Sequence, residues 1–257
     1  MKQRYNMLIV CILLGFCLPA FCTAVLVNEN DNVVNSVIQF NGNPNFKISS
    51  YGYEFTPHAK YVVVFDKNSE YWVNLDNKKI ERYSSYDDLE YCKSDFITKT
   101  GAIDIAESFI QAHEREIELK DFSLVVSGLM DGGDVNTYNF LWRKYVGDIE
   151  GPNLIFISIN PTTGAVIHYI NIDRPILVSL ENKITQEEAE FIAINQFPGI
   201  NFHNNDSKLK VRYDEKGSQR LIWECSVSGD PKEIILRGGI VHIDAQSGEV
   251  IRIDIPM

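Results

Sequence analysis

Two segments of the chain place apolar residues at the spacing of an amphipathic helix. The apolar positions recur every three or four residues, so they share one helix face. They are Ala102, Ile105, Ala106, Phe109 and Ile110 in the first segment and Ala189, Ile192, Ala193 and Phe197 in the second. Thr185 and Glu188 form a capping-box pattern, and Pro198-Gly199 ends the second helix. The small alanines predict that each helix packs closely on a sheet.

Alternating apolar and polar residues follow each predicted helix and indicate strands with one buried face. The runs are Ile155, Ile157 and Ile159; Leu221, Trp223, Cys225 and Val227; and Ile251, Ile253 and Ile255. The turns Pro161–Gly164 and Ala245–Gly248 join two strands each, with glycine where a positive φ is expected. We therefore expect an α+β fold in which one helix packs on an antiparallel sheet of about four strands.

The pattern of a helix followed by strands occurs more than once along the chain. The helix pattern Thr98-x-x-x-Ala102 returns as Thr185-x-x-x-Ala189, a displacement of 87 (185 minus 98). The closing hairpin at Ile159–Ile167 returns at Ile243–Ile251, a displacement of 84 (243 minus 159). The sequence thus predicts tandem units at residues 97–172 and 184–257.

Residues 28–90 are expected to form a degenerate first unit. Counting back 84 positions from Asn160 reaches Asp76, which lies in another segment of the form apolar, acidic, turn, apolar. We expect its turn to be shorter than the other two, and it lacks their glycine. The upstream stretch Val33–Phe40 is only a weak helix candidate, because it lacks the threonine and alanine spacing.

Residues 1–24 have the pattern of a secretory signal peptide. Lys2 and Arg4 precede the apolar run Met7–Phe16, and small residues near Ala24 indicate a cleavage site. No charge occurs between residues 7 and 27, so an uncleaved membrane anchor is the alternative. Both alternatives predict an extracellular or cell-surface protein, which contacts a membrane only through such an anchor.

The charge of the chain argues against nucleic acid as a partner. Asp and Glu number 35 against 24 Lys and Arg, which gives a formal net charge of −11. An acidic protein is not attracted to phosphate backbones. The densest basic stretch, Lys208–Arg212, holds only three cations, and we expect it to be a solvated strand face.

Few residues form a pattern that carries chemistry. Cys225 and His242 could form a thiolate–imidazole pair, but the apolar neighbours of Cys225 predict a buried, inert thiol. His113-Glu114 begins like a zinc-peptidase motif, yet Ile117 replaces the second histidine, so we expect His113 at the solvent edge of a helix. The loop Asp131–Asn136 has a spacing that favours a hairpin turn over a calcium site. We predict no catalytic, cofactor-binding or metal-binding residues, and the sequence does not identify partner-binding residues.

Three further features concern packing and binding. Trp72, Trp142 and Trp223 recur on similar strands, which favours core packing over an aromatic ligand platform. Cys92 and Cys225 are the two cysteines outside the N-terminal segment, and an oxidising compartment would permit a disulfide between them. A core Cys225 and a loop Cys92 without a bridge are the simpler expectation. Exposed sheet edges are the better candidates for binding an extended peptide.

Together these residues resemble the PepSY domain, which occurs in propeptides of thermolysin-type metallopeptidases and in exported bacterial and archaeal proteins. The resemblance rests on the capped helix with its alanine spacing, Pro198-Gly199, the strand residues Trp142 and Trp223, and the hairpin Ile243–Ile251. It covers residues 184–256 best, whereas no Pro-Gly follows the helix of residues 97–172. The resemblance implies a PepSY/cystatin-like fold in tandem copies.

The resemblance also implies a noncatalytic role, in which the protein binds a peptidase as an inhibitor, folding aid or regulator. It supplies no catalytic residues. Because the sequence stops at Met257, directly after the last predicted strand, we expect such a protein to act on its peptidase in trans. One alternative is a cell-surface structural or sensory domain held by the N-terminal anchor. Another is an enzyme with a site between units that uses Cys225, His242 or the Asp131 loop.

Overall fold

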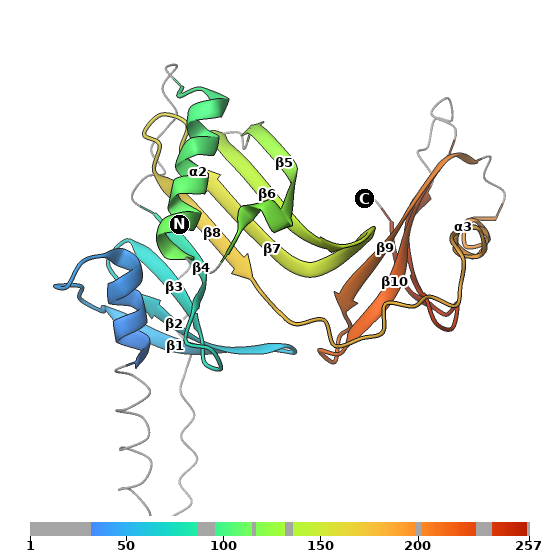
Figure 1. Cartoon of the computed structure of the whole chain (residues 1–257), viewed down its shortest axis with the longest axis horizontal. Coiled ribbons are helices and arrows are strands. Elements are labelled where there is room, and N and C mark those ends of the chain that lie inside the picture. Colours follow the sequence, from blue (N-terminus) through green and yellow to red (C-terminus); the bar gives the residue numbers. More distant parts are fainter. Residues whose placement is uncertain are drawn as a thin grey trace, which may run out of the picture.

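A computed structural model describes residues 32–86, 96–114, 117–131, 136–198, 202–229 and 238–255 of the chain. Twelve strands form one sheet, and the helices pack on it (Figure 1). The strands are β1 (Ser50–Thr56), β2 (Ala59–Phe65), β3 (Ser69–Asn74), β4 (Ile80–Ser85), β5 (Phe122–Asp131), β6 (Asn136–Val146), β7 (Ile149–Ile159), β8 (Val166–Ile172), β9 (Phe202–Tyr213), β10 (Gln219–Gly229), β11 (Gly238–Asp244) and β12 (Val250–Asp254). The helices are residues 32–41, α2 (Lys99–His113) and α3 (Gln186–Ile194), with a 3-10 turn at Leu119–Asp121.

The sheet has a branched strand order. Its main path is β1-β2-β3-β4-β8-β7-β9-β10-β11-β12, and β6 and β5 extend from β7 as a side branch. β7 contacts three strands because its residues 154–159 pair with β8, whereas Glu150 lies beyond the end of β8 and pairs with Lys210 of β9. The pairing of β7 with β9 is parallel, and the other strand pairs are antiparallel.

The predicted architecture, with tandem units that each have a helix on a separate antiparallel sheet of about four strands, is wrong. The strands form one large mixed sheet, because β4 pairs with β8 and β7 pairs with β9. The alternation of apolar residues predicts a strand and its buried face. It does not predict that a strand of one unit pairs with a strand of the next unit, as β4 does with β8 and β7 with β9. The residue bounds of the predicted units, 28–90, 97–172 and 184–257, stay predictions.

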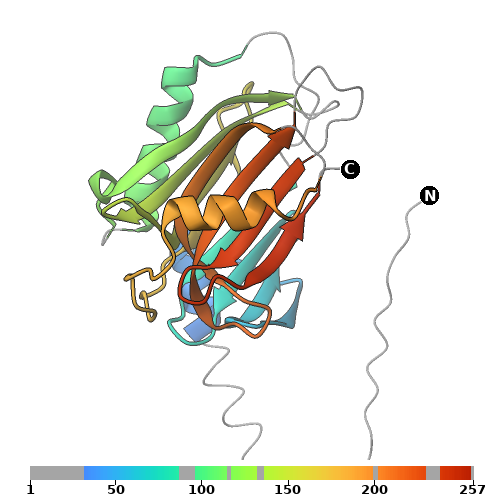
Figure 2. The same ribbon diagram turned by 90° about the vertical axis from the view of Figure 1, so that its right-hand side faces the viewer.

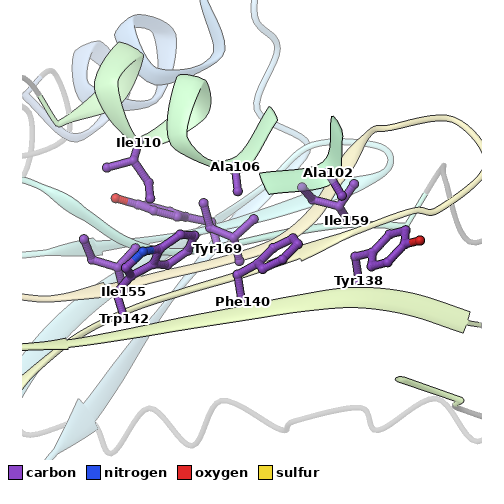
Figure 3. Close-up of a cluster of buried hydrophobic side chains, with 10 residues drawn as sticks. Ala102, Ala106, Ile110, Tyr138, Phe140, Trp142, Ile155, Ile159 and Tyr169 are labelled. Carbon is purple, nitrogen blue, oxygen red and sulfur yellow. The ribbon is translucent and has the colours of Figure 1, made fainter. Parts of the chain in front are cut away.

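The hydrophobic core consists of three clusters between helices and strands. Thr98 caps α2 by accepting a hydrogen bond from the N–H of Gly101. The buried face of α2 then lies on large side chains of β6, β7 and β8 (Figure 3). The α2 residues are Ala102, Ala106 and Ile110, and the strand residues are Tyr138, Phe140, Trp142, Ile155, Ile157, Ile159 and Tyr169. The predicted α2 stripe and its alanine contacts are confirmed.

The other two helices bury their apolar faces in the same manner. α3 has the capping box predicted for Thr185 and Glu188, and its Ala189 and Ala193 pack on β9, β10 and β11. Figure 2 shows α3 lying across these strands. The weak candidate near the N-terminus is a helix at residues 32–41, which buries Val33 and Val37 against β2 and β3.

Three hairpins, β3–β4, β7–β8 and β11–β12, close with the same backbone hydrogen bonds. In each one, the residue before the turn donates its N–H to the carbonyl five residues ahead and accepts from the N–H four residues ahead. These residues are Asn74, Asn160 and Asp244. The position four ahead has φ of 75° at Gly164, 76° at Gly248 and 60° at Lys78. The first turn is therefore as long as the others, contrary to expectation, and it begins at Asn74 and tolerates a lysine where glycine is favoured.

A cluster of charged side chains lies at the β7–β9 joint. The carboxylate of Glu150 contacts Arg143 Nε at 3.3 Å, Lys210 Nζ at 3.3 Å and the guanidinium of Arg212. Lys210 also contacts Glu224 at 2.6 Å. Glu150 is 7% exposed and Lys210 is 9% exposed, so the expectation of a solvated face at Lys208–Arg212 is wrong for Lys210. Buried charges need partners, and here the partners of Glu150 come from the neighbouring strands β6 and β9.

A second buried carboxylate fixes the chain after β8. Glu81 of β4 is 3% exposed and accepts hydrogen bonds from Tyr61 Oη at 2.8 Å and Asn74 Nδ2 at 2.7 Å. Arg174 donates to the same carboxylate through both terminal nitrogens, at 2.5 and 2.6 Å. Because Arg174 lies in the segment between β8 and α3, this contact sets the direction in which the chain leaves β8.

Replacing Glu150 by glutamine should strongly destabilise the protein. The change keeps the shape of the side chain but leaves buried Lys210 and its neighbours short of one negative charge. We expect a loss of about 3 kcal/mol in the free energy of unfolding, measured by urea titration. The control is Glu118→Gln, which removes an exposed ion pair with Lys120 and should cost less than about 1 kcal/mol. Equal losses in the two variants would contradict a structural role for the Glu150 cluster.

The contribution of Glu150 should disappear in acid. Burial alone would raise the pKa of this carboxyl, but the hydrogen bond and charge of Arg212, with Arg143 and Lys210, outweigh it and hold the pKa below its usual 4.5. The unfolded chain therefore binds a proton before the folded protein does, and stability present above pH 4.5 is lost as pH falls through the folded pKa. Urea titrations at a series of pH values should show wild type and Glu150→Gln converging below pH 4.5. A constant difference would contradict this.

Candidate functional site

The two residues considered for a thiolate–imidazole pair lie on opposite faces of the sheet. In the β10–β11 register Cys225 is opposite Val241, and both are buried beneath α3. His242 is the next residue along and is opposite Glu224, so its side chain points to the other face, where it contacts Asp254 at 3.1 Å. Burial raises the pKa of the Cys225 thiol to about 12. The structure therefore does not bring Cys225 and His242 together.

His113 is partly buried, and it contacts a second helix in addition to lying at the edge of its own. Its imidazole lies between the rings of Phe40 and Phe109, with centroid distances of 4.3 and 4.1 Å. Its nitrogens lie 2.7 Å from the carbonyl oxygen of Phe109 and 2.9 Å from that of Phe40. His113 thus connects α2 to the helix at residues 32–41. The sequence contains no local signal for this contact, because Phe40 and His113 are 73 positions apart.

The tryptophans differ in their surroundings. Trp142 and Trp223 are 3% and 8% exposed in the clusters beneath α2 and α3, so their predicted core role is confirmed. Trp72 is only partly buried. It lies on the face of β3 away from the helix, where the Arg82 guanidinium is 4.9 Å from its ring centroid. Trp72 pairs with Arg82 in the β3–β4 register.

No metal centre is found among the described residues. Within them no three His, Cys, Asp or Glu side chains group closely enough to hold an ion. Residues 132–135 of the loop Asp131–Asn136 lie outside the described ranges, as does Cys92. Cys225 is a free, buried thiol. A hollow on the outer parts of β9–β12 is lined by charged and apolar side chains. Its Arg220 already pairs with carboxylates of the same chain, with Asp214 at 3.0 Å and with Asp244 at 3.1 Å.

The most exposed apolar residues of the sheet lie on its outer strands. β1 pairs only with β2, β5 only with β6, and β12 only with β11 in the part of the chain that the structure describes. On β1, Tyr51 is 55% and Phe55 68% exposed, and the strand is open on both faces. β5 and β12 expose aliphatic side chains and Met130.

The backbone of β1 can accept another strand. The carbonyl of Phe65 on β2 faces β1, because it accepts from the N–H of Ser49 at 2.8 Å. The backbone N–H and C=O groups of successive residues point to opposite sides of a strand, so every second residue of β2 directs these groups to β1. The β1 residues opposite them in the register are Ser50, Gly52 and Glu54. The backbone N–H and C=O groups of Tyr51 and Phe55 therefore point away from β2. Nothing within 4 Å would meet a side chain at Gly52, so the strand surface is accessible there.

Comparison with known proteins finds distant similarities of structure. No protein-family model and no curated protein matches the sequence. The chain is similar to the Bacillus megaterium YpeB C-terminal domain, with 14% identity, a TM-score of 0.48, and coverage of 88% of this chain and 97% of that one. It is also similar to an uncharacterized protein from Eubacterium rectale, with 11% identity, a TM-score of 0.37, and coverage of 89% and 82%. TM-scores below 0.5 assign no family or function, so the PepSY resemblance stays a prediction.

The described helices include none that is long and apolar enough to cross a membrane. Residues 1–24, for which we predict a signal peptide or an anchor, lie outside the described ranges. The predicted location outside the cell or on its surface thus rests on the sequence pattern.

The Cys225 thiol should resist modification in the native protein. Its raised pKa leaves little thiolate at pH 8, and α3 covers the sulfur. We expect labelling by a thiol reagent to be at least about 100-fold slower than in urea, followed by the mass of the peptide that carries Cys225. Rapid native labelling would contradict a buried thiol and would return Cys225 to the candidates for chemistry.

Proposed function

We propose that the protein is an exported, noncatalytic module that binds another protein, a peptidase, in trans. The partner contributes an extended segment that pairs with the outer edge of β1. The observation that carries this proposal is the combination of outward-facing backbone groups and exposed aromatic rings at Tyr51 and Phe55.

Strand addition supplies both affinity and selectivity. Backbone hydrogen bonds to the edge strand hold the segment, and alternate side chains enter or leave the surface beside it. Aromatic side chains bury a large area and lose little conformational entropy, so they are enriched where binding energy concentrates. β1 presents both features, whereas β5 and β12 present aliphatic edges.

The choice of a peptidase as partner rests on the sequence pattern. Residues 97–172 and 184–256 resemble PepSY domains, a family that binds peptidases. The export pattern of residues 1–24 would bring the protein to the compartment of secreted peptidases. The separation of Cys225 from His242 removes the pair on which an enzymatic alternative chiefly depended.

The experiment is a titration of the full-length protein into the peptidases secreted by its source organism. Residual proteolytic activity is recorded against molar ratio, and bound peptidase is recovered by co-purification. We expect activity to fall in proportion to the added protein until a stoichiometric complex forms. If proteolytic activity does not fall and no peptidase co-purifies at molar excess of the protein, the proposed function is contradicted.

Variants test whether β1 is the binding edge. Tyr51→Lys combined with Phe55→Lys should weaken binding at least about tenfold, because it removes two aromatic contacts and adds charge to the edge. The matched control is Phe191→Lys, since Phe191 is 68% exposed on α3, a helix away from this edge. Unchanged binding by the double variant would place the site elsewhere on the protein.

A further inference from the structure

The closing strands of the three similar hairpins differ in their partners. β4 and β8 pair with each other in antiparallel orientation, through Tyr83↔Tyr169 at the centre of the contact. β12, the closing strand of the third hairpin, pairs only with β11 among the described strands. The chain thus already contains one antiparallel contact between two such strands, and it presents a third strand of this kind at an edge.

The outer edge of β12 presents backbone N–H and C=O groups that another strand can pair with. Asp244 of β11 donates its N–H to the carbonyl of Glu249 at 2.8 Å, so the backbone of Asp244 faces β12. By alternation the backbone of His242 also faces β12, and the register pairs it with Arg252. The backbone N–H and C=O groups of Ile253 therefore point away from β11, to the outside of the sheet.

The side chains of β12 are complementary to a second copy of the same strand. If two β12 strands pair in antiparallel orientation about a two-fold axis at Ile253, Arg252 lies opposite Asp254 of the second copy. Asp254 in turn lies opposite Arg252 of the second copy, and the two copies of Ile253 lie opposite each other. Opposite charges and apolar side chains are the cross-strand pairs that stabilise antiparallel strands. Ile251, Ile253 and Ile255 are all more than a third exposed in the single chain, so the buried face predicted for this run is wrong.

Other edges and other registers lack this complementarity. An axis at Asp254 would place the two copies of this carboxylate opposite each other, and like charges in direct opposition are unfavourable. The same operation on β1, with the axis at Tyr53, would place Glu54 opposite Gly52. Only the axis at Ile253 pairs both charges of β12 with their opposites.

We propose that two copies of this chain associate through β12 in an antiparallel, two-fold arrangement centred on Ile253. The contact extends the sheet from one copy into the other. Arg252 and Asp254 also contact each other within one chain, at 2.6 Å, and they are partly exposed, so they can turn to the second copy. The paired segment is short, which favours a dimer that forms with rising concentration rather than a permanent one.

Sedimentation velocity of the full-length protein over a wide concentration range tests the dimer. We expect the wild type to shift from monomer to dimer as concentration rises. Asp254→Arg places arginines opposite each other at both ends of the contact, and Arg252→Asp places aspartates there. Each variant alone should dimerise at least about tenfold more weakly than wild type.

A mixture of the two single variants is the decisive sample. The chain that carries Arg252→Asp has an aspartate at both positions, and the chain that carries Asp254→Arg has an arginine at both. Across the two-fold axis each aspartate therefore meets an arginine, so both charge pairs are restored in a heterodimer. We expect the equimolar mixture to dimerise while each variant alone stays monomeric, an outcome that misfolding of either variant does not produce. A wild type that stays monomeric throughout, or a mixture no better than its components, would overturn the proposal.

The test separates this contact from the proposed binding of a peptidase. Tyr51→Lys with Phe55→Lys leaves β12 intact, and this variant should dimerise like wild type. Loss of dimerisation in that variant would contradict the assignment to β12.

Discussion

The arrangement of the whole sheet depends on the burial of one carboxylate, that of Glu150. β7 and β9 meet in parallel at a single residue pair, which by itself is a small contact. Glu150 adds charge contacts to Arg143 of β6 and to Lys210 and Arg212 of β9, in a place where water does not compete strongly. These contacts hold β9, and with it the strands beneath α3, against β6 and β7.

Two further contacts also join the strands beneath α3 to the rest of the structure. Glu81 binds Arg174 and thereby holds the start of the segment that leads to α3. At the other end, the ring of His58 in the β1–β2 turn stacks on Tyr213, with centroids 4.7 Å apart. Three separated contacts constrain orientation better than one, so we infer that the edges β1 and β12 keep fixed positions relative to each other.

The local elements were predictable from the sequence, and the contacts between them were not. Local spacing predicted the capping box at Thr185, the alanine stripes, the buried Trp142 and Trp223, and two of the turns. The role of Lys210 was missed because its partners, Glu150 and Glu224, lie on other strands. The length of the β3–β4 turn was predicted wrongly, because Lys78 occupies a backbone conformation that glycine normally marks. The sequence indicated that exposed sheet edges are candidates for binding, but it did not identify the edge at Tyr51 and Phe55. Which strand lies at the edge of a sheet depends on the topology.

The central claim is that the joint at Glu150 makes one rigid body of the strands beneath α2 and those beneath α3. The most direct measurement is the distance between spin labels at Ser108→Cys on α2 and Glu187→Cys on α3, both exposed positions. The other cysteines are replaced by serine except buried Cys225, and unlabelled protein is added to suppress signals between copies. The account predicts a single narrow distance distribution, which broadens when Glu150 is replaced by glutamine. A broad or two-peaked distribution in the otherwise wild-type chain would contradict it.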